Sequence, residues 1–257
     1  MILLRSMAFN AWFYGVTTVV SLWHSLFTRR PRAVMAAARG WAALVLAGLR
    51  PCCRIDWVVT GREHLPASGA ALIAPMHQSA FDTLVWLLLV PDCVYVLKRE
   101  LTRVPLFGAL LLRAGMIPVD REAGAPAMRE LIRRAVAAAA ADRQIVIFPE
   151  GTRVPPGVTA RLQPGIAALA TRTGLPVIPV VTDSGLYWGR RAFRKLPGTI
   201  RIAILPPLPA RLPRDALMAE LARAYAEGYA ALRRGKPVDN SVGAVSPDLR
   251  HQPSGLS

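Results

Sequence analysis

The stretch AALIAPMHQSAFD, residues 70–82, decides the fold around the candidate chemistry of this chain. An apolar run, Ala70–Ala74, is followed three positions later by His77, and Asp82 stands five positions beyond that histidine. A short continuous apolar run is typical of a strand buried on both faces. Ser79-Ala80-Phe81-Asp82 has the form of a capping box, which predicts a helix with Ser79 as its N-cap. His77 is therefore expected on a turn at the carboxyl end of a strand, where open α/β sheets place their ligands.

His77 and Asp82 are residue types suited to general base catalysis. A histidine near its ordinary pKa can accept a proton from a hydroxyl group, and a neighbouring carboxylate fixes which ring nitrogen is free to do so. Five helical steps separate side chains by about 140° around the axis, so the pair can meet only if His77 lies before the helix. The alternative interpretation is that Asp82 merely caps its helix and that His77 is a hydrogen-bonded loop residue.

Short apolar runs alternate with helical stretches beyond residue 54. This alternation predicts an α/β domain with a mixed, largely parallel central sheet flanked by helices. The run from Ile200 alternates in polarity and indicates a half-exposed or edge strand. The expected strands are residues 56–60, 70–74, 94–97, 116–119, 144–148, 177–182 and 200–205, and the expected helices are residues 83–89, 125–141, 164–173 and 214–233.

Candidate binding residues follow other expected strands, at the edge where His77 is also expected. In the stretch Phe148–Arg153, Gly151 permits a positive φ, and Arg153 can hold a phosphate through two parallel hydrogen bonds. Glu150 is expected either to accept a hydrogen bond from a substrate hydroxyl or to hold the loop. Solvated surface charge is the default for any single cation, but several cations at one edge indicate an anion site. The candidate substrate-binding residues are Lys98, Arg121, Glu150, Gly151, Thr152 and Arg153.

The first 50 residues predict a membrane-associating element of two helices. No formally charged residue occurs from Ser6 to Thr28, and arginines stand at 29, 30 and 32. A second apolar stretch, Ala33–Leu49, contains Arg39. Either the first segment spans the bilayer with the arginines on the cytoplasmic side, or both segments form a hairpin in one leaflet with Arg39 snorkelling to the surface. We favour the hairpin, because polar residues such as Asn10 weaken a full span. A cleaved signal peptide fits less well, because the charges follow the apolar run.

Composition narrows the choice of partner. The chain is 53% hydrophobic and carries 32 Lys and Arg against 16 Asp and Glu, a net charge of +16. Such an excess indicates an anionic membrane surface or a phosphorylated substrate, and no nucleic acid is expected because nucleic-acid-binding motifs are missing. The three cysteines form neither a disulfide framework nor a zinc-ligand pattern, so a reducing setting and no metal are expected. We expect an α/β domain over residues 51–235 and a disordered tail over residues 236–257.

Four blocks in this order resemble the glycerophospholipid acyltransferase family, and the resemblance covers about residues 55 to 206. The blocks are His77–Asp82, Gly115–Arg121, Phe148–Arg153 and Val177–Val180. Met76 stands where the family often has asparagine. Gln163-Pro164-Gly165 stands where the family often has Lys-x-Gly, which puts the acyl-donor or head-group preference in doubt.

The resemblance implies an O-acyltransferase of phospholipid biosynthesis, most similar to bacterial members that act on 1-acyl-glycerol-3-phosphate. An acyl group would pass from acyl-CoA or acyl-carrier protein to the free hydroxyl of this lipid, giving phosphatidic acid. His77 would be the base, Asp82 would orient it, and no cofactor would be needed. The implied location is the inner membrane, with the active site facing the cytoplasm.

Three alternatives remain. The acceptor could be another lyso-lipid, such as a lyso-ornithine lipid or another lysophospholipid. A hydrolase with a Ser-His-Asp triad has Ser79 and Ser184 available, but no Gly-x-Ser-x-Gly elbow is present. A non-catalytic membrane protein that binds anionic lipid or nucleic acid would rest on the net charge alone.

Overall fold

The computed structural model describes residues 1–120 and 122–235. Arg121 and the tail expected to be disordered, residues 236–257, lie outside the described residues.

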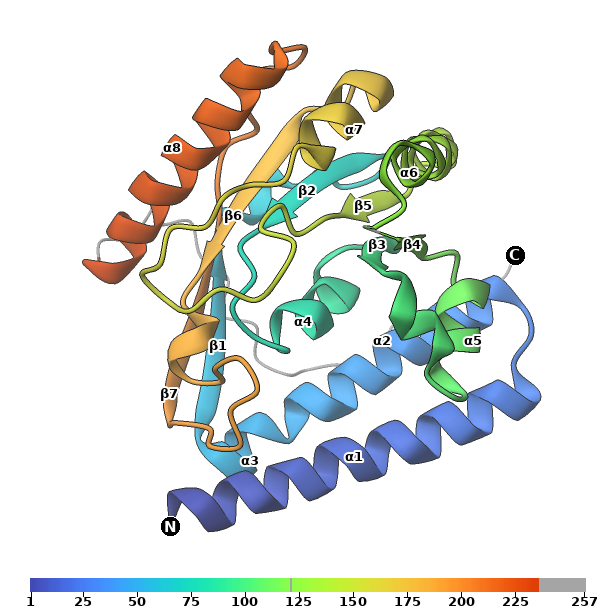
Figure 1. The fold of residues 1–257 in the computed structure, drawn as a ribbon. Coiled ribbons are helices and arrows are strands. Elements are labelled where there is room, and N and C mark those ends of the chain that lie inside the picture. The colour runs from blue at the N-terminus through green and yellow to red at the C-terminus, as the bar shows by residue number, and fades with distance from the viewer. Residues whose placement is uncertain (121, 236–257) are drawn as a thin grey trace, which may run out of the picture.

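A seven-stranded mixed sheet lies at the centre of the molecule (Figure 1). Its strand order is β1-β7-β6-β2-β5-β3-β4, and every neighbouring pair is parallel except β6 and β7. The α/β fold class is confirmed, and each expected strand is present with its ends shifted by two residues at most. The strands are β1 Ile55–Thr60, β2 Ala71–Pro75, β3 Cys93–Lys98, β4 Ile117–Val119, β5 Gln144–Val146, β6 Val177–Thr182 and β7 Gly198–Ile204.

The edge position considered for the strand at Ile200 is wrong. β7 lies inside the sheet, because β1 pairs along its outer side from Ile55–Gly198 to Thr60–Ala203. The polar position that gave the strand its alternating pattern is Arg201. Its Nε donates a hydrogen bond to the buried carboxylate of Asp183 at 2.8 Å, so the charge is satisfied without an exposed sheet edge.

Helices cover both faces of the sheet. Successive side chains of a strand point to opposite faces. In β2, Ala71 and Ile73 pack toward α4 (Asp82–Leu89) and the N-terminal helices. Leu72 and Ala74 pack toward the opposite face, which is covered by α6 (Gly124–Ala140), α7 (Gly165–Thr173) and α8 (Arg214–Arg233). Four helices correspond to expected ones, and α3 and α5 were not predicted. The helices after the first two are α3 Leu49–Cys53, α4 Asp82–Leu89, α5 Phe107–Arg113, α6 Gly124–Ala140, α7 Gly165–Thr173 and α8 Arg214–Arg233.

The two N-terminal helices, α1 (Ile2–Phe27) and α2 (Pro31–Ala47), lie side by side below the rest of the molecule (Figure 1). The snorkelling expected for Arg39 is wrong: its Nη1 donates to the carbonyls of Val90 and Pro91 at 2.8 and 2.9 Å, just after the C-terminus of α4. Carbonyl groups at a helix C-terminus attract cations, so this arginine ties α2 to the α/β domain.

By length and composition alone, one helical stretch among the described residues could cross a membrane. It runs from Pro31 to Cys53, and 39% of its apolar 18-residue segment is buried inside the protein. Buried core helices pass the same test. The first segment, which one of the two expected arrangements makes the span, does not meet this criterion. α1 instead exposes large apolar side chains along its length, namely Leu3, Leu4, Met7, Tyr14, Val19, Leu22, Trp23, Leu26 and Phe27.

The inner face of α1 is anchored to the loop that follows β6. Phe9 is completely buried and meets the ring of Trp188 edge to face, with the ring centroids 5.1 Å apart. Edge-to-face aromatic pairs are favourable beyond the apolar area that they bury. Docking of α1 therefore depends on a side chain that lies far away in the sequence.

Replacing Phe9 by Ala is expected to lower the free energy of unfolding by about 3–5 kcal/mol, because it leaves a cavity between α1 and the loop. Denaturant unfolding in detergent, followed by tryptophan fluorescence, measures the change. Tyr14→Ala is the matched control, since Tyr14 lies on the same helix with 66% of its surface exposed. Equal losses in the two variants would contradict the docking described here.

Candidate active site

The carboxylate of Asp82 organises the turn between β2 and α4. Asp82 is 3% exposed, and its Oδ2 accepts hydrogen bonds from the backbone N–H groups of Gln78 and Ser79, both at 2.7 Å. Its Oδ1 accepts a hydrogen bond from the hydroxyl of Ser184 at 2.6 Å. A buried carboxylate is costly unless its oxygens are hydrogen-bonded, and these donors meet that requirement.

Half of the capping box expected at this turn is present, and the expected N-cap at Ser79 is wrong, because Phe81 is the residue that directly precedes the helix. The N–H of Ser79 donates to Asp82 Oδ2, and the N–H of Phe81 donates to Ser79 Oγ at 3.1 Å. The regular helix begins at Asp82, because Thr83 and Leu84 make i→i−3 hydrogen bonds at its start. His77 consequently lies before the helix, as its pairing with Asp82 requires.

The imidazole of His77 lies beside this carboxylate. Its Nδ1 is 3.3 Å from Asp82 Oδ2, and its ring stacks on Phe148 with the centroids 4.1 Å apart. A carboxylate at Nδ1 favours the tautomer that carries its proton there. Nε2 is then left unprotonated, with a lone pair able to accept a proton.

The backbone of His77 is held on both sides by the segment that follows β5. The N–H of His77 donates to Glu150 Oε2 at 2.6 Å, and the carbonyl of His77 accepts from the N–H of Val154 at 2.8 Å. The first and third sequence blocks thus form one hydrogen-bonded unit, because the strands that precede them, β2 and β5, are neighbours in the sheet.

Glu150 takes the second of the two roles that its sequence position suggested. It is buried behind the histidine turn, is not among the residues that line the cavity, and holds the loop. Burial raises the pKa of Glu150 to about 8; the N–H of His77 lowers this pKa and the charge of Asp82 raises it. The neutral acid is therefore substantially populated near neutral pH.

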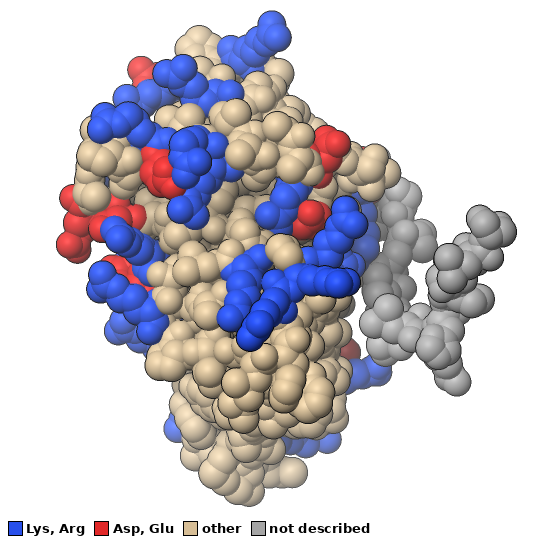
Figure 2. All heavy atoms as spheres, turned by 90° about the vertical axis from the view of Figure 1, so that its right-hand side faces the viewer, with Lys and Arg blue, Asp and Glu red and all other residues tan. Residues whose placement is uncertain are grey.

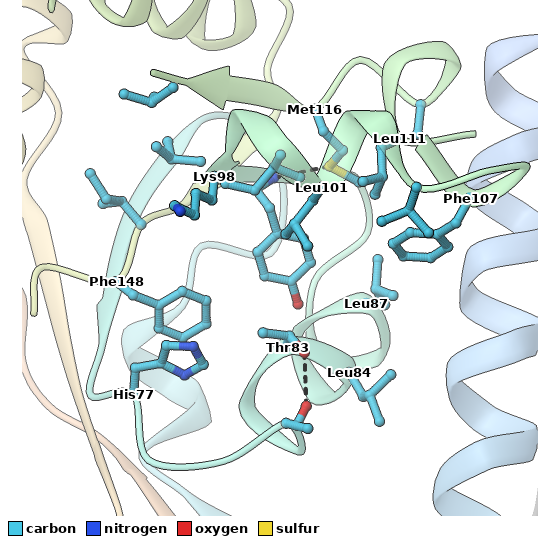
Figure 3. A pocket seen from close by; sticks show the side chains of 18 of the residues that line it. His77, Thr83, Leu84, Leu87, Lys98, Leu101, Phe107, Leu111, Met116 and Phe148 are labelled. Carbon is cyan, nitrogen blue, oxygen red and sulfur yellow. Dashed lines mark hydrogen bonds between the residues drawn. The ribbon is translucent and has the colours of Figure 1, made fainter. Parts of the chain in front are cut away.

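A cavity of about 940 Å³ opens beside His77. Figure 3 shows His77, stacked on Phe148, and Lys98 at one side of this cavity, and Leu84, Leu87, Leu111 and Phe107 toward its other side. Side chains of α1 and α2 complete the wall, among them Val20, Val34 and Trp41. The imidazole thus lies where the polar and apolar parts of the cavity meet.

Cations gather at the polar end of the cavity. Arg153 and Thr152 line it beside His77, and Gly151 lines it with φ 70°, a conformation that glycine adopts more readily than other residues. Lys98 also lines it, but its Nζ is paired with Glu100 at 2.9 Å.

Sequence reasoning missed two lining residues, Arg190 and Arg191. They lie in a loop outside the four blocks. The signal that could have pointed to them is a pair of consecutive arginines shortly after the carboxyl end of the strand Val177–Thr182.

The geometry does not favour a Ser-His-Asp triad. Ser184 donates to Asp82 and not to His77, and Ser79 Oγ accepts from the backbone of Phe81. In the part of the chain that the structure describes, no three His, Cys, Asp or Glu side chains are grouped to hold a metal ion.

Comparison with known proteins shows which family this chain resembles. A family model described as Acyltransferase matches residues 56–183. The chain is 32% identical over 210 residues to a 1-acyl-sn-glycerol-3-phosphate acyltransferase of Pseudomonas aeruginosa, covering 81% of this chain and 79% of that protein. It is 31% identical over 153 residues to the mouse 1-acyl-sn-glycerol-3-phosphate acyltransferase alpha, covering 58% of this chain and about half, 54%, of that protein.

A solved structure shares the fold. The crystal structure of the 1-acyl-sn-glycerophosphate acyltransferase from Thermotoga maritima matches with a TM-score of 0.71 at 21% sequence identity. The match covers 91% of this chain and 99% of that one. The mixed sheet, its flanking helices and the long N-terminal helix therefore belong to a known architecture.

The raised pKa of Glu150 predicts how stability depends on pH. The folded protein holds the proton of Glu150 up to about pH 8, whereas an exposed glutamate loses it near 4.5. The stability contributed by this proton is complete below about pH 4.5 and is lost as the pH rises through about 8. Glu150→Gln keeps a neutral acceptor for the N–H of His77, so its thermal midpoint should fall less over this range than that of the unmodified protein.

Thermal unfolding at a series of pH values tests this expectation, with Glu63→Gln, at an exposed position, as the control. Parallel pH profiles for the unmodified protein and Glu150→Gln would show that Glu150 carries no such proton.

Proposed function

We propose a function for this protein from its family: the chain belongs to the acyltransferase family that contains its Pseudomonas aeruginosa relative. The protein is an O-acyltransferase that moves a fatty acyl group from an acyl thioester to the free hydroxyl of 1-acyl-glycerol-3-phosphate, giving phosphatidic acid. The observation that carries the proposal is the His77–Asp82 pair where the cationic end of the cavity meets its apolar part.

The proposed reaction uses His77 as its base. Asp82 holds the Nδ1 proton, so Nε2 takes the proton of the acceptor hydroxyl as its oxygen attacks the thioester carbonyl. The tetrahedral intermediate then collapses, the carbon–sulfur bond breaks, and the departing thiolate takes the proton from the imidazolium. The hydroxyl proton has moved to sulfur and the imidazole is neutral again.

The cationic end of the cavity would hold the acceptor phosphate. Arg153 lies on the segment that bonds to the backbone of His77, so a phosphate on its guanidinium places the neighbouring hydroxyl near the imidazole. The ammonium of Lys98 is already paired with Glu100. Lys98 would therefore attract the phosphate from a distance and not bind it directly. For Arg121, which lies outside the described residues, the proposed contact with the substrate rests on the sequence alone.

The apolar part of the cavity would take the acyl chains. Its walls come from both the α/β domain and the N-terminal helices, so a lipid entering from a membrane meets apolar side chains along its path. Holding both substrates in register next to the base supplies rate by proximity.

The surface is consistent with a place on a membrane. Figure 2 shows Lys and Arg side chains gathered over the upper and middle part of one face, and a mostly uncharged lower part at the height of α1 in Figure 1. Apolar surface flanked by basic side chains is typical of proteins that sit on anionic lipid. We propose that residues 1–50 anchor the domain of residues 51–235 to the inner membrane, with the site facing the cytoplasm and acyl-CoA or acyl-carrier protein as the donor.

Turnover with defined substrates tests the proposed function. Purified protein in detergent is incubated with radiolabelled acyl-CoA and a panel of acceptors: 1-acyl-glycerol-3-phosphate, a lyso-ornithine lipid and zwitterionic lysophospholipids. Labelled phosphatidic acid as the main product supports the proposal, and preferential labelling of another lipid assigns a different acceptor.

His77→Ala is expected to lower kcat by about 10²–10⁴-fold, the usual contribution of a general base, while the variant remains folded and bound to membranes. His64→Gln is the control, since His64 bonds to the carbonyl of Ile204 and is not among the cavity residues. Initial rates together with circular dichroism measure both properties. Activity of His77→Ala close to that of the control would remove the proposed base.

Arg153→Gln is expected to raise KM for 1-acyl-glycerol-3-phosphate by about tenfold, the effect of losing a charge-assisted hydrogen bond. KM for the acyl thioester should change little, because the lost charge serves the phosphate. Steady-state kinetics with each substrate varied in turn measures both constants. An unchanged acceptor KM would show that Arg153 does not contact the phosphate.

A further inference from the structure

A tight turn in the loop after β6 delivers two adjacent arginines to the active-site cavity. The N–H of Ala192 donates to the carbonyl of Gly189 at 3.1 Å, so Arg190 and Arg191 are the two central residues of a β-turn. Neighbouring side chains on an extended strand point to opposite sides. Arg191 instead adopts φ 54°, and both side chains line the same cavity as Arg153 and His77.

Their guanidinium groups form no ion pair with a carboxylate of the described residues. Among the described residues, no carboxylate oxygen lies within 4 Å of a guanidinium nitrogen of Arg153, Arg190 or Arg191. The three groups also interact: burial lowers the pKa of Arg153, Asp82 raises it, and Arg190 and Arg191 lower it again. Cations gathered without counter-charges favour a bound anion.

The turn is braced by a buried lysine. Lys195 is 3% exposed, and its Nζ donates to Asn10 Oδ1 of α1 and to the carbonyls of Ala192 and Phe193. Its ammonium also lies 5.5–5.8 Å from the ring centroids of Phe9, Trp188 and Phe193. A buried ammonium needs such hydrogen bonds and ring faces to offset its lost hydration. The loop is therefore fixed against α1, and the two arginines are held in place before any ligand binds.

We propose that Arg190 and Arg191, together with Arg153, form the site that binds the phosphate monoester of the acceptor and selects acceptors with a doubly charged head group. This inference rests on the proposed function. A phosphate monoester carries a charge of roughly −1.5 to −2 near pH 7, which several guanidiniums can match through charge-assisted hydrogen bonds. A zwitterionic head group adds a cation that the arginines repel, and a neutral glyceride leaves them unpaired.

The position of the site agrees with the chemistry of the acceptor. Adjacent carbon atoms of 1-acyl-glycerol-3-phosphate carry the free hydroxyl and the phosphate, so the anion site must lie next to the base. Arg153 is linked to the backbone of His77 through Val154, and the turn at Arg190 and Arg191 contributes to the same cavity. One phosphate can then be held from two separate loops.

The test compares Arg190→Gln, Arg191→Gln and the double variant with Arg194→Gln. Arg194 is exposed in the same loop and is not among the cavity residues, which makes it the matched control. We expect the double variant to raise KM for 1-acyl-glycerol-3-phosphate by about tenfold or more. KM for acyl-CoA and kcat should stay within about twofold, as should every constant of Arg194→Gln.

Two outcomes would overturn the inference. One is an unchanged acceptor KM in the double variant. The other is a rise confined to KM for acyl-CoA, which would assign the arginines to the phosphates of the donor.

A binding measurement separates this inference from the proposed function. If the unmodified protein does not acylate 1-acyl-glycerol-3-phosphate, isothermal titration calorimetry with this lipid in detergent, without any acyl donor, still tests the site. Binding that is weakened in the double variant and retained in Arg194→Gln supports the inference. Equal affinity in all the proteins contradicts it.

Discussion

The buried carboxylate of Asp82 is the group on which the architecture of the site depends. A charge at this depth persists only when its oxygens are hydrogen-bonded, and its donors come from two places: the turn that carries His77 and the segment that follows β6. Satisfying one carboxylate therefore fixes the start of α4, the position of the imidazole and the start of the loop that carries Arg190 and Arg191.

The other segments of the site are brought together by the central position of β2 in the sheet. Its neighbours on either side are β5 and β6, and the segments after these three parallel strands emerge at the same edge of the sheet. The segment after β5 holds the backbone of His77 through Glu150 and Val154. The arrangement places a base, a group of cations and an apolar cavity together, although the residues involved come from separate parts of the chain.

Much of this could be predicted from the sequence, because burial on both faces leaves continuous apolar runs and because the residues from His77 to Asp82 are contiguous. The local sequence pattern misleads where the environment of a polar residue is set by a partner far away in the chain. Arg201 made β7 resemble an edge strand, but its guanidinium donates a hydrogen bond to the buried carboxylate of Asp183. Arg39 resembled a snorkelling residue because its neighbours are apolar, yet its carbonyl partners stand more than 50 positions away. Arg190 and Arg191 belong to no motif, and only the folded chain brings them to the cavity.

The attachment of α1 constrains the order in which the parts of the protein can fold. Ser6 accepts a hydrogen bond from the N–H of Lys195, 189 positions later, and β1 has its parallel partner in β7, which begins at Gly198. Chains leave the ribosome from the N-terminus onward, so the first helix emerges long before its docking surface exists. If residues 1–50 anchor the protein as proposed, the lipid bilayer shelters the apolar side chains of α1 during that interval, and the finished domain closes onto a helix that is already at the membrane.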